Sequence, residues 1–171
     1  MRVVVGSDER TGLTDALVAW LQRQGHDVEL VGPLAGEPLD WPEVGERVAQ
    51  RLVSGLAEGG IVCCWTGTGV AMAANKVPGI RAALCADAGT ARGARRWDHA
   101  NVLVLSLRST AIPIAEEVLE AWFATPYDPA EAGVVAKLTH VDQKYRRKPR
   151  TADWLDEELR PSIRLRGAKG R

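Results

Sequence analysis

Five short apolar segments, each followed by a helix-like pattern, constrain the fold of this chain more than any other feature. The apolar segments are residues 2–5, 28–31, 60–63, 81–85 and 102–105. The helix-like segments are residues 14–24, 41–56, 70–74, 88–96 and 113–124. Short buried strands that alternate with helices are connected as parallel strands with crossover helices. The sequence therefore predicts one α/β domain with a parallel sheet of five strands, a size that 171 residues can fill.

The end of the chain differs in composition from the rest. Residues 130–144 predict one further helix, and residues 145–171 are basic, beginning with Arg146, Arg147 and Lys148. We expect a domain over residues 1–144 and a basic C-terminal arm over residues 145–171. A short helix over residues 154–159 of this arm is one option, as is RNA binding, although short basic tails are usually only solvated.

Composition argues against several classes of protein. Lys and Arg total 22 and Asp and Glu total 22, so the net charge favours neither nucleic acid nor a membrane surface as a partner. No apolar run approaches the roughly 18 residues of a membrane span, and residues 1–6 read as a strand without a signal-peptide pattern. The three cysteines form no disulfide framework, and they and His26, His99 and His140 lack metal-ligand spacing. We expect a cytoplasmic protein without a metal.

Residues 61–76 are the segment that most directly suggests chemistry. A buried strand leads into a glycine loop at residues 66–69 and then into a helix of small residues, with Cys64 at the junction. Backbone N–H groups at a helix N-terminus favour a phosphate, a carboxylate or an oxyanion, and they lower the pKa of a nearby thiol. This arrangement predicts chemistry on an anionic small molecule, with Cys64 as base or nucleophile. Cys63 should face the opposite side of the sheet, and Cys85 should be an inert buried residue.

Other interpretations of the glycine loop remain open. A dinucleotide fingerprint needs a third glycine in register and normally follows the first strand. A phosphate-binding P-loop needs a lysine beside the second glycine, whereas Lys76 lies at the far end of the helix. Both nucleotide interpretations are weak. A tight strand-to-helix turn without a ligand is a further alternative.

Longer matching segments identify a family resemblance. These segments are residues 64–69 (CWTGTG), 73–84 (AANKVPGIRAAL), 6–8, 40–42 and 98–105. In this order and spacing, over roughly residues 1–144, the chain resembles the ribose-5-phosphate isomerase B and galactose-6-phosphate isomerase family. The resemblance implies a Rossmann-like, three-layer α/β/α fold and a homodimer or homotetramer with shared active sites. It also implies cofactor-free aldose–ketose isomerisation of a small sugar phosphate through a cis-enediolate, with ribose 5-phosphate of the pentose phosphate reactions as the family default.

The resemblance also implies roles for the glycine loop. Cys64 aligns with the cysteine base of one branch of the family, whereas the glutamate base of another branch is replaced by Val70. Thr66 matches a hydroxyl residue that assists ring opening or oxyanion binding, and the amides of Gly67 and Gly69 would complete an anion hole. Thr68 belongs to the same substrate-binding loop.

Several aligned positions depart from the family pattern. Asp8 is retained, but Glu9 replaces a substrate-contacting histidine and Trp41 replaces a tyrosine. The histidine that opens the sugar ring is replaced by Trp97, which cannot transfer a ring proton, so Asp98 or His99 would have to open the ring. Arg108 matches a phosphate-binding arginine, while a late arginine pattern is replaced by residues 136–140. The remaining candidates for binding the anion are Arg10, Lys137 and His140.

Three functions fit these matches and departures. The first is an active isomerase with altered substrate recognition; a substrate that is already open-chain, such as a tetrose phosphate, would not need ring opening. The second is a subunit that needs a different partner chain, and the third is a non-catalytic sugar-phosphate-binding protein. Cys64, Thr66 and the glycine loop favour the first, because a binding protein has no need of a thiol beside an anion site. His99 is either catalytic or a hydrogen-bonded structural residue.

Overall fold

The core of the molecule is one five-stranded parallel sheet. The computed structural model describes residues 1–146. The strands are β1 (Arg2–Ser7), β2 (Asp27–Val31), β3 (Gly59–Cys64), β4 (Ala82–Leu84) and β5 (Val102–Ser106). They pair in the order β2-β1-β3-β5-β4, and every neighbouring pair is parallel. This confirms the predicted parallel sheet, because each apolar segment of the sequence supplies one strand.

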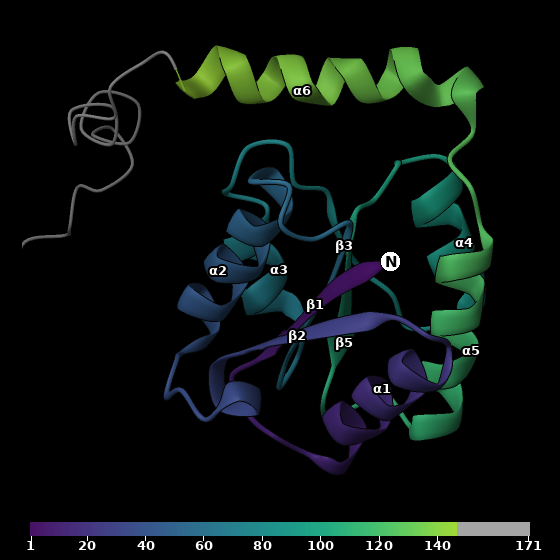
Figure 1. The fold of residues 1–171 in the computed structure, drawn as a ribbon. Coiled ribbons are helices and arrows are strands. Elements are labelled where there is room, and N and C mark those ends of the chain that lie inside the picture. Colours follow the sequence, from purple (N-terminus) through teal and green to yellow (C-terminus); the bar gives the residue numbers. More distant parts are fainter. Residues whose placement is uncertain (147–171) are drawn as a thin grey trace, which may run out of the picture.

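Helices cover both faces of this sheet (Figure 1). They are α1 (Gly12–Arg23), α2 (Trp41–Val53), α3 (Thr68–Ala74), α4 (Ala88–Arg96) and α5 (Ile112–Ala124), with a short 3-10 helix η1 (Gly32–Ala35). Side chains of α1, α4 and α5 pack on one face, around Leu17 and Leu119, and those of α2 and α3 pack on the other, around Val48 and Val70. The Rossmann-like three-layer α/β/α architecture is therefore confirmed.

Helix starts follow capping signals in the sequence. Thr11 and Thr14 form a reciprocal capping box at α1, and Asp40 and Glu43 form one at α2. The end of α2 differs from the prediction: the helix stops at Val53 rather than near residue 56, because Gly55 adopts a left-handed conformation with φ +73°. The loop predicted over residues 32–40 contains η1.

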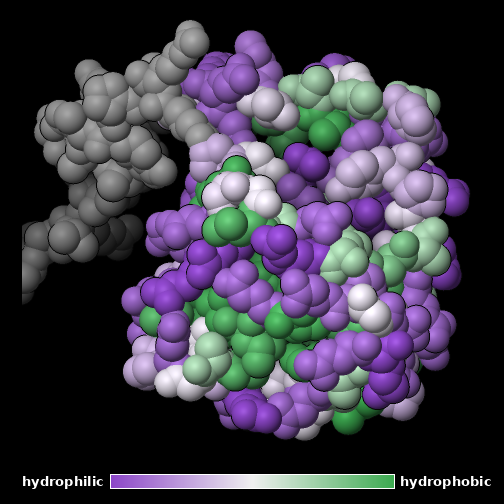
Figure 2. Space-filling model, in the orientation of Figure 1, coloured by the Kyte–Doolittle hydropathy of each residue, from purple (hydrophilic) through white to green (hydrophobic). Residues whose placement is uncertain are grey.

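The last helix stands apart from the layered body. A 3-10 turn η2 (Pro129–Glu131) leads into α6 (Ala132–Arg146), which runs across the top of the view in Figure 1. Four of its large apolar side chains, Val134, Leu138, Val141 and Tyr145, are at least half exposed, and apolar surface shows on this helix in Figure 2. The helix predicted over residues 130–144 is thus present with shifted ends. Residues 147–171, with most of the predicted basic arm and its optional helix, lie outside the described residues.

Candidate active site

The carboxyl ends of three neighbouring strands define one edge of the sheet where candidate residues meet. The register pairs Ser7 of β1 with Cys63 of β3, and Cys64 of β3 with Ser106 of β5. Asp8 follows β1 directly, so it enters the same edge. Ligands of open α/β sheets bind at the carboxyl ends of the strands.

The two adjacent cysteines face opposite sides of the sheet, as predicted. Cys63 packs in the core formed with α1, α4 and α5, whereas Cys64, 5% exposed, packs in the core formed with α2 and α3. Burial raises the pKa of Cys63 to about 12, and burial likewise raises the pKa of Cys85 to about 12. Both thiols therefore remain protonated at neutral pH, in accord with the inert role predicted for Cys85.

A tight turn places the glycine loop directly after Cys64. The Gly67 N–H donates to the Cys64 carbonyl oxygen at 3.1 Å, which closes a β-turn with Trp65 and Thr66 at its centre. Gly67 has φ +76°, and a Cβ atom there would lie 2.5 Å from the side chain of Leu84. Only glycine fits both the backbone angle and this close approach.

The same loop lies against the indole of Trp41. A Cβ atom on Gly69 would lie 3.1 Å from this ring, so glycine is what allows the ring to lie on the loop. Trp41 is the first residue of α2, and 41% of its side chain remains exposed. The structure thereby places Trp41 against the glycine loop.

The two threonines of the loop form a pair. Thr66 Oγ1 and Thr68 Oγ1 lie 2.7 Å apart, within hydrogen-bond distance, on either side of Gly67. Both residues are exposed. Their hydroxyl groups are therefore open to a small molecule at this edge of the sheet.

The loop after β5 is fastened to the loop after β3. The Leu107 N–H donates to the Cys64 carbonyl oxygen, and the Arg108 N–H and the Ser106 hydroxyl donate to the Trp65 carbonyl oxygen, all at 3.0 Å. These bonds place Arg108 beside the glycine loop. Ser106 was not predicted as a site residue; its only signal in the sequence is a polar residue at the end of an apolar strand.

Residues after β1 divide between the site and the surface of α1. One carboxylate oxygen of Asp8 (Oδ1) is buried and lacks a hydrogen-bond partner among the described residues. Burial raises the pKa of this carboxyl group, and the nearby charges of Glu9 and Asp40 raise it further. A buried acceptor without a partner is a candidate contact for a substrate hydroxyl.

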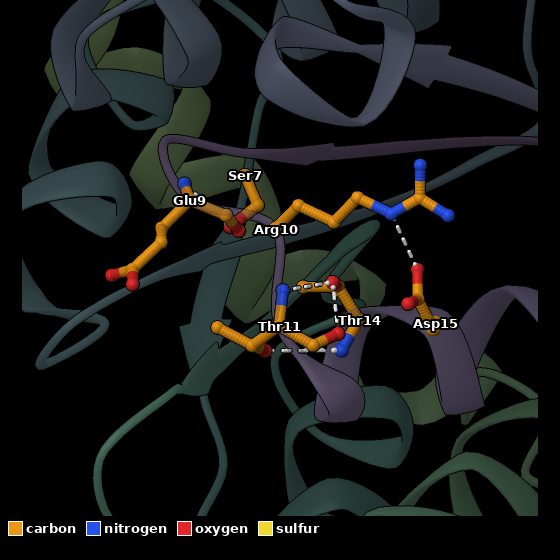
Figure 3. A network of polar contacts seen from close by, with 6 residues as sticks. All are labelled: Ser7, Glu9, Arg10, Thr11, Thr14 and Asp15. Carbon is orange, nitrogen blue, oxygen red and sulfur yellow. Dashed lines mark hydrogen bonds and ion pairs between the residues drawn. The ribbon is translucent and has the colours of Figure 1, made fainter.

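Glu9 and Arg10 point in opposite directions (Figure 3). The Arg10 Nε atom pairs with Asp15 Oδ1 of α1 at 2.8 Å, and both residues line a surface pocket of about 330 Å³ that also includes Leu30 and Leu34. The structure therefore does not bring Arg10 to the loop after β3.

A second group of candidate residues lies at the opposite edge of the sheet. Trp97, Asp98 and His99 precede β5, so they lie where the strands begin rather than where they end. The Trp97 ring packs against Gly93 of the preceding helix α4. A Cβ atom at Gly93 would lie 2.9 Å from this ring. One chain does not bring these residues together with Cys64.

His99 is held by three contacts. It adopts a left-handed backbone conformation with φ +49°. The Nε2 atom of His99 lies 2.8 Å from the carbonyl oxygen of Asp128, and its ring stacks on Tyr127 with centroids 4.8 Å apart. The Arg81 Nε atom donates to the carbonyl oxygen of His99 at 2.8 Å. These contacts give His99 the hydrogen-bonded structural environment that the sequence left open, and they fix the loop that carries Trp97 and Asp98.

Lys137 and His140 belong to this second group as well. Both are exposed on α6, whose start is held beside residues 96–99 because the Asp128 N–H donates to the Arg96 carbonyl oxygen. Over residues 1–146, no group of three or more His, Cys, Asp or Glu side chains is arranged to hold a metal ion. Within the same residues no helix is long and apolar enough to cross a membrane.

Comparison with known proteins adds independent findings. A family model described as Ribose/Galactose Isomerase matches residues 3–138. The ribose-5-phosphate isomerase B of Escherichia coli is 34% identical over 116 residues, covering 68% of this chain and 78% of that protein. The galactose-6-phosphate isomerase subunit LacB of Clostridium acetobutylicum is 37% identical over 112 residues, covering 66% of this chain. The match spans 65% of that subunit, slightly less than two thirds of its length.

A solved structure shares the fold. The ribose-5-phosphate isomerase B of Clostridium thermocellum superimposes with a TM-score of 0.79 at 33% sequence identity. The superposition covers 85% of this chain and 99% of that one.

Proposed function

The chain belongs to the ribose/galactose isomerase family of sugar-phosphate aldose–ketose isomerases, and from this premise we propose that it isomerises a small sugar phosphate through a cis-enediolate with Cys64 as the base. The observation that carries the proposal is the position of Cys64 at the carboxyl end of β3, in one turn with Thr66 and Gly67. In this mechanism Cys64 removes a proton from C2 of the aldose and returns it to C1 of the ketose. Cys63 and Cys85 are unsuited to this role, because burial raises the pKa of each to about 12.

The groups around Cys64 have complementary roles in the proposal. The Gly67 N–H is already donated to the Cys64 carbonyl oxygen, so Gly67 contributes the shape of the turn rather than a free donor. The Gly69 amide and the Thr66 hydroxyl face the developing oxyanion. Gly69 lies in the first turn of α3, where N–H groups lack intrahelical partners. Asp8 accepts a hydrogen bond from a sugar hydroxyl through its buried, unpartnered oxygen. Trp41 contacts the apolar face of the sugar, and Glu9 a hydroxyl.

The phosphate-binding end of the proposed site combines two chains. Arg108 lies beside the glycine loop, whereas Trp97, Asp98 and His99 precede β5 at the other edge of the sheet, and Lys137 and His140 lie on α6. We therefore propose a homodimer or homotetramer in which each site takes Cys64 from one copy and the second group from another. The exposed apolar side chains of α6 supply a surface for this association.

Ribose 5-phosphate is the default substrate of this proposal. Trp97 has no group that can transfer a ring proton, and one ring nitrogen of His99 is engaged with the Asp128 carbonyl oxygen. An open-chain substrate, such as a tetrose phosphate, needs no ring-opening group and fits these positions better. Arg10, which is paired with Asp15, is the least supported of the substrate-binding candidates.

A second function is favoured by one observation. The two groups of candidate residues lie at opposite edges of the sheet within one chain, so a different partner chain could complete the site as well as a second copy could. The chain would then be a partner-dependent subunit, or a sugar-phosphate-binding subunit without activity of its own.

Solvent deuterium exchange tests the proposed function. Purified protein in D₂O is incubated with four- to six-carbon aldose and ketose phosphates, and NMR follows deuterium at C1 and C2. We expect exchange and conversion in the wild type, loss of both in Cys64→Ala, and retention of both in Cys85→Ala, which removes a buried thiol elsewhere. Full activity of Cys64→Ala would exclude the cysteine base, and a wild type without any exchange would favour the partner-dependent or binding subunit.

A further inference from the structure

The Thr66–Thr68 hydroxyl pair has a chemical consequence beyond oxyanion binding. Thr66 stands at the third position of the turn that begins at Cys64, and Thr68 is the first residue of α3. Their Oγ1 atoms are 2.7 Å apart, and either can be the donor. We propose that this pair relays a proton between the two oxygens, O1 and O2, of the enediolate; the inference rests on the proposed isomerase function.

Aldose–ketose isomerisation needs two proton transfers. One moves a proton between carbons C2 and C1, and this is the transfer proposed for Cys64. The other moves a proton between oxygens O2 and O1, because the aldose carries its hydroxyl on C2 and the ketose carries it on C1. A base at the carbons does not accomplish the second transfer, so other groups must.

The relay balances in atoms and charge. After Cys64 takes the C2 proton, the negative charge lies on O1 and O2 still carries its proton. The Thr66 hydroxyl gives its proton to O1, Thr66 takes the proton of the Thr68 hydroxyl, and Thr68 takes the proton of O2. Both threonines end neutral and the charge lies on O2. The C2–O2 bond then becomes the carbonyl of the ketose as the Cys64 thiol returns its proton to C1.

The geometry of the pair suits this transfer. A hydroxyl group has one proton and two acceptor lone pairs, so two bonded hydroxyls retain one free donor at one end and a free acceptor at the other. The O1 and O2 atoms of a cis-enediolate lie on adjacent carbons on the same side, separated by about the length of an O–H···O hydrogen bond, the spacing that the two Oγ1 atoms also have. Reversal of every bond direction gives the same relay for the ketose-to-aldose reaction.

The backbone fixes the spacing of the two hydroxyls. Gly67 lies between them in its left-handed conformation, covered by Leu84, and the turn is closed by the Gly67 N–H bond to the Cys64 carbonyl oxygen. The pair therefore depends little on the substrate for its geometry.

The experiment uses the full-length protein and the substrate found in the exchange panel. Thr68→Val keeps the shape of the side chain and removes its hydroxyl, Thr68→Ser keeps the hydroxyl, and Thr90→Val is the matched control. The Thr90 hydroxyl is also hydrogen-bonded, to Asp87 on α4. In D₂O, NMR measures the deuterium that enters C2 of recovered aldose and, in the same sample, the ketose that forms.

The relay predicts a change in the ratio of these two quantities. In Thr68→Val the enediolate still forms but its oxygen proton transfer is slowed, so it returns to deuterated aldose more often. We expect the exchange-to-conversion ratio to rise by about 100-fold or more, because a positioned proton-transfer group contributes roughly 10²- to 10⁴-fold. We expect the wild-type ratio in Thr68→Ser and Thr90→Val.

Other outcomes overturn the relay in distinguishable ways. If exchange and conversion fall together in Thr68→Val with an unchanged ratio, Thr68 only shapes the loop. A raised ratio in Thr68→Ser would show that the methyl group, not the hydroxyl, matters. Absence of exchange in the wild type would overturn the isomerase proposal and the relay with it.

Discussion

Two buried thiols outside the proposed chemistry make the stability of the protein fall at alkaline pH. Burial raises the pKa of Cys63 and of Cys85 from 9.0 to about 12. Their contribution to stability is complete below pH 9 and is lost as pH rises toward 12, because the unfolded chain then releases protons that the folded chain retains. Each thiol lowers the free energy of unfolding by at most about 1.4 kcal/mol per pH unit in this window.

This gives a prediction for Cys85→Ala. We expect the urea midpoint of the wild type to fall between pH 9 and pH 10.5 and the midpoint of the variant to fall less steeply, while both are flat near pH 7. Chemical denaturation at four pH values measures the difference. Parallel curves above pH 9 would mean that Cys85 ionises as readily in the folded chain as in the unfolded one.

Arg108 and Arg10 form a natural pair of variants for the phosphate end of the site. Arg108 lies beside the glycine loop, whereas Arg10 is paired with Asp15 on α1. We expect Arg108→Ala to raise KM by about 10- to 100-fold, as for a lost hydrogen bond to a charged group, with a smaller effect on kcat. Arg10→Ala should leave both constants near wild type. A defect confined to kcat in Arg108→Ala would contradict an anchoring role.

The sequence predicted the residues that stand directly after strands better than those that depend on packing. Cys64, Thr66 and Asp8 are placed by strand ends alone, and parallel strands end at one edge. The position of the Arg10 side chain was not predictable, because its ion pair depends on how the segment after β1 places Arg10 against Asp15 of α1. The contacts of His99 depend on Asp128 and Tyr127, which lie about thirty residues further along the chain.

At the scale of elements, the turn between β3 and α3 needs glycine for two separate reasons. Gly67 and Gly25 have nearly the same backbone angle, with φ +76° and +77°. A Cβ atom at Gly67 would lie 2.5 Å from Leu84 and 3.2 Å from the Leu105 carbonyl oxygen, whereas one at Gly25 would meet nothing within 4 Å.

Alanine substitutions at Gly25 and Gly67 separate the effect of the backbone angle from the effect of the close approach. We expect Gly25→Ala to lower the free energy of unfolding by about 1–2 kcal/mol through backbone strain alone. Gly67→Ala should cost about 1–3 kcal/mol more, through overpacking, and should also reduce activity because the Thr66–Thr68 spacing changes. Chemical denaturation and the exchange assay measure both effects. Equal costs at the two positions would mean that Leu84 moves aside freely.

Element types followed from sequence more reliably than element ends. The residues of α4 were predicted without error because Asp87 caps its start and charged residues end it. The strand β3 includes Cys64, one residue beyond the prediction, because its pairing with Ser106 extends the ladder. That extension depends on the neighbouring strand, which a local pattern does not contain.

At the scale of the whole molecule, α6 presents an exposed apolar face. Val134, Leu138, Val141 and Tyr145 are spaced so that they share one face of the helix, and all are at least half exposed. The sequence predicted the helix but not its separation from the body, since that depends on the path of the chain after Asp128.

Charge placed on either face of α6 tests the proposed association. We expect Leu138→Glu to shift the protein from dimer or tetramer to monomer and to abolish activity, because the second residue group no longer reaches Cys64 of another copy. Thr139→Glu adds the same charge outside the apolar face and should leave both unchanged. Light scattering gives the mass and the exchange assay gives the activity. An active Leu138→Glu monomer would exclude a shared site.

The placement of the two residue groups at opposite sheet edges has a genetic consequence. In the proposed dimer, one allele that lacks Cys64 and another that lacks Lys137 and His140 each encode an inactive protein. When both are expressed together, a mixed dimer gathers both defects into one site and leaves the other site intact. Two recessive null alleles would then complement each other in a cell, although neither encodes a working enzyme.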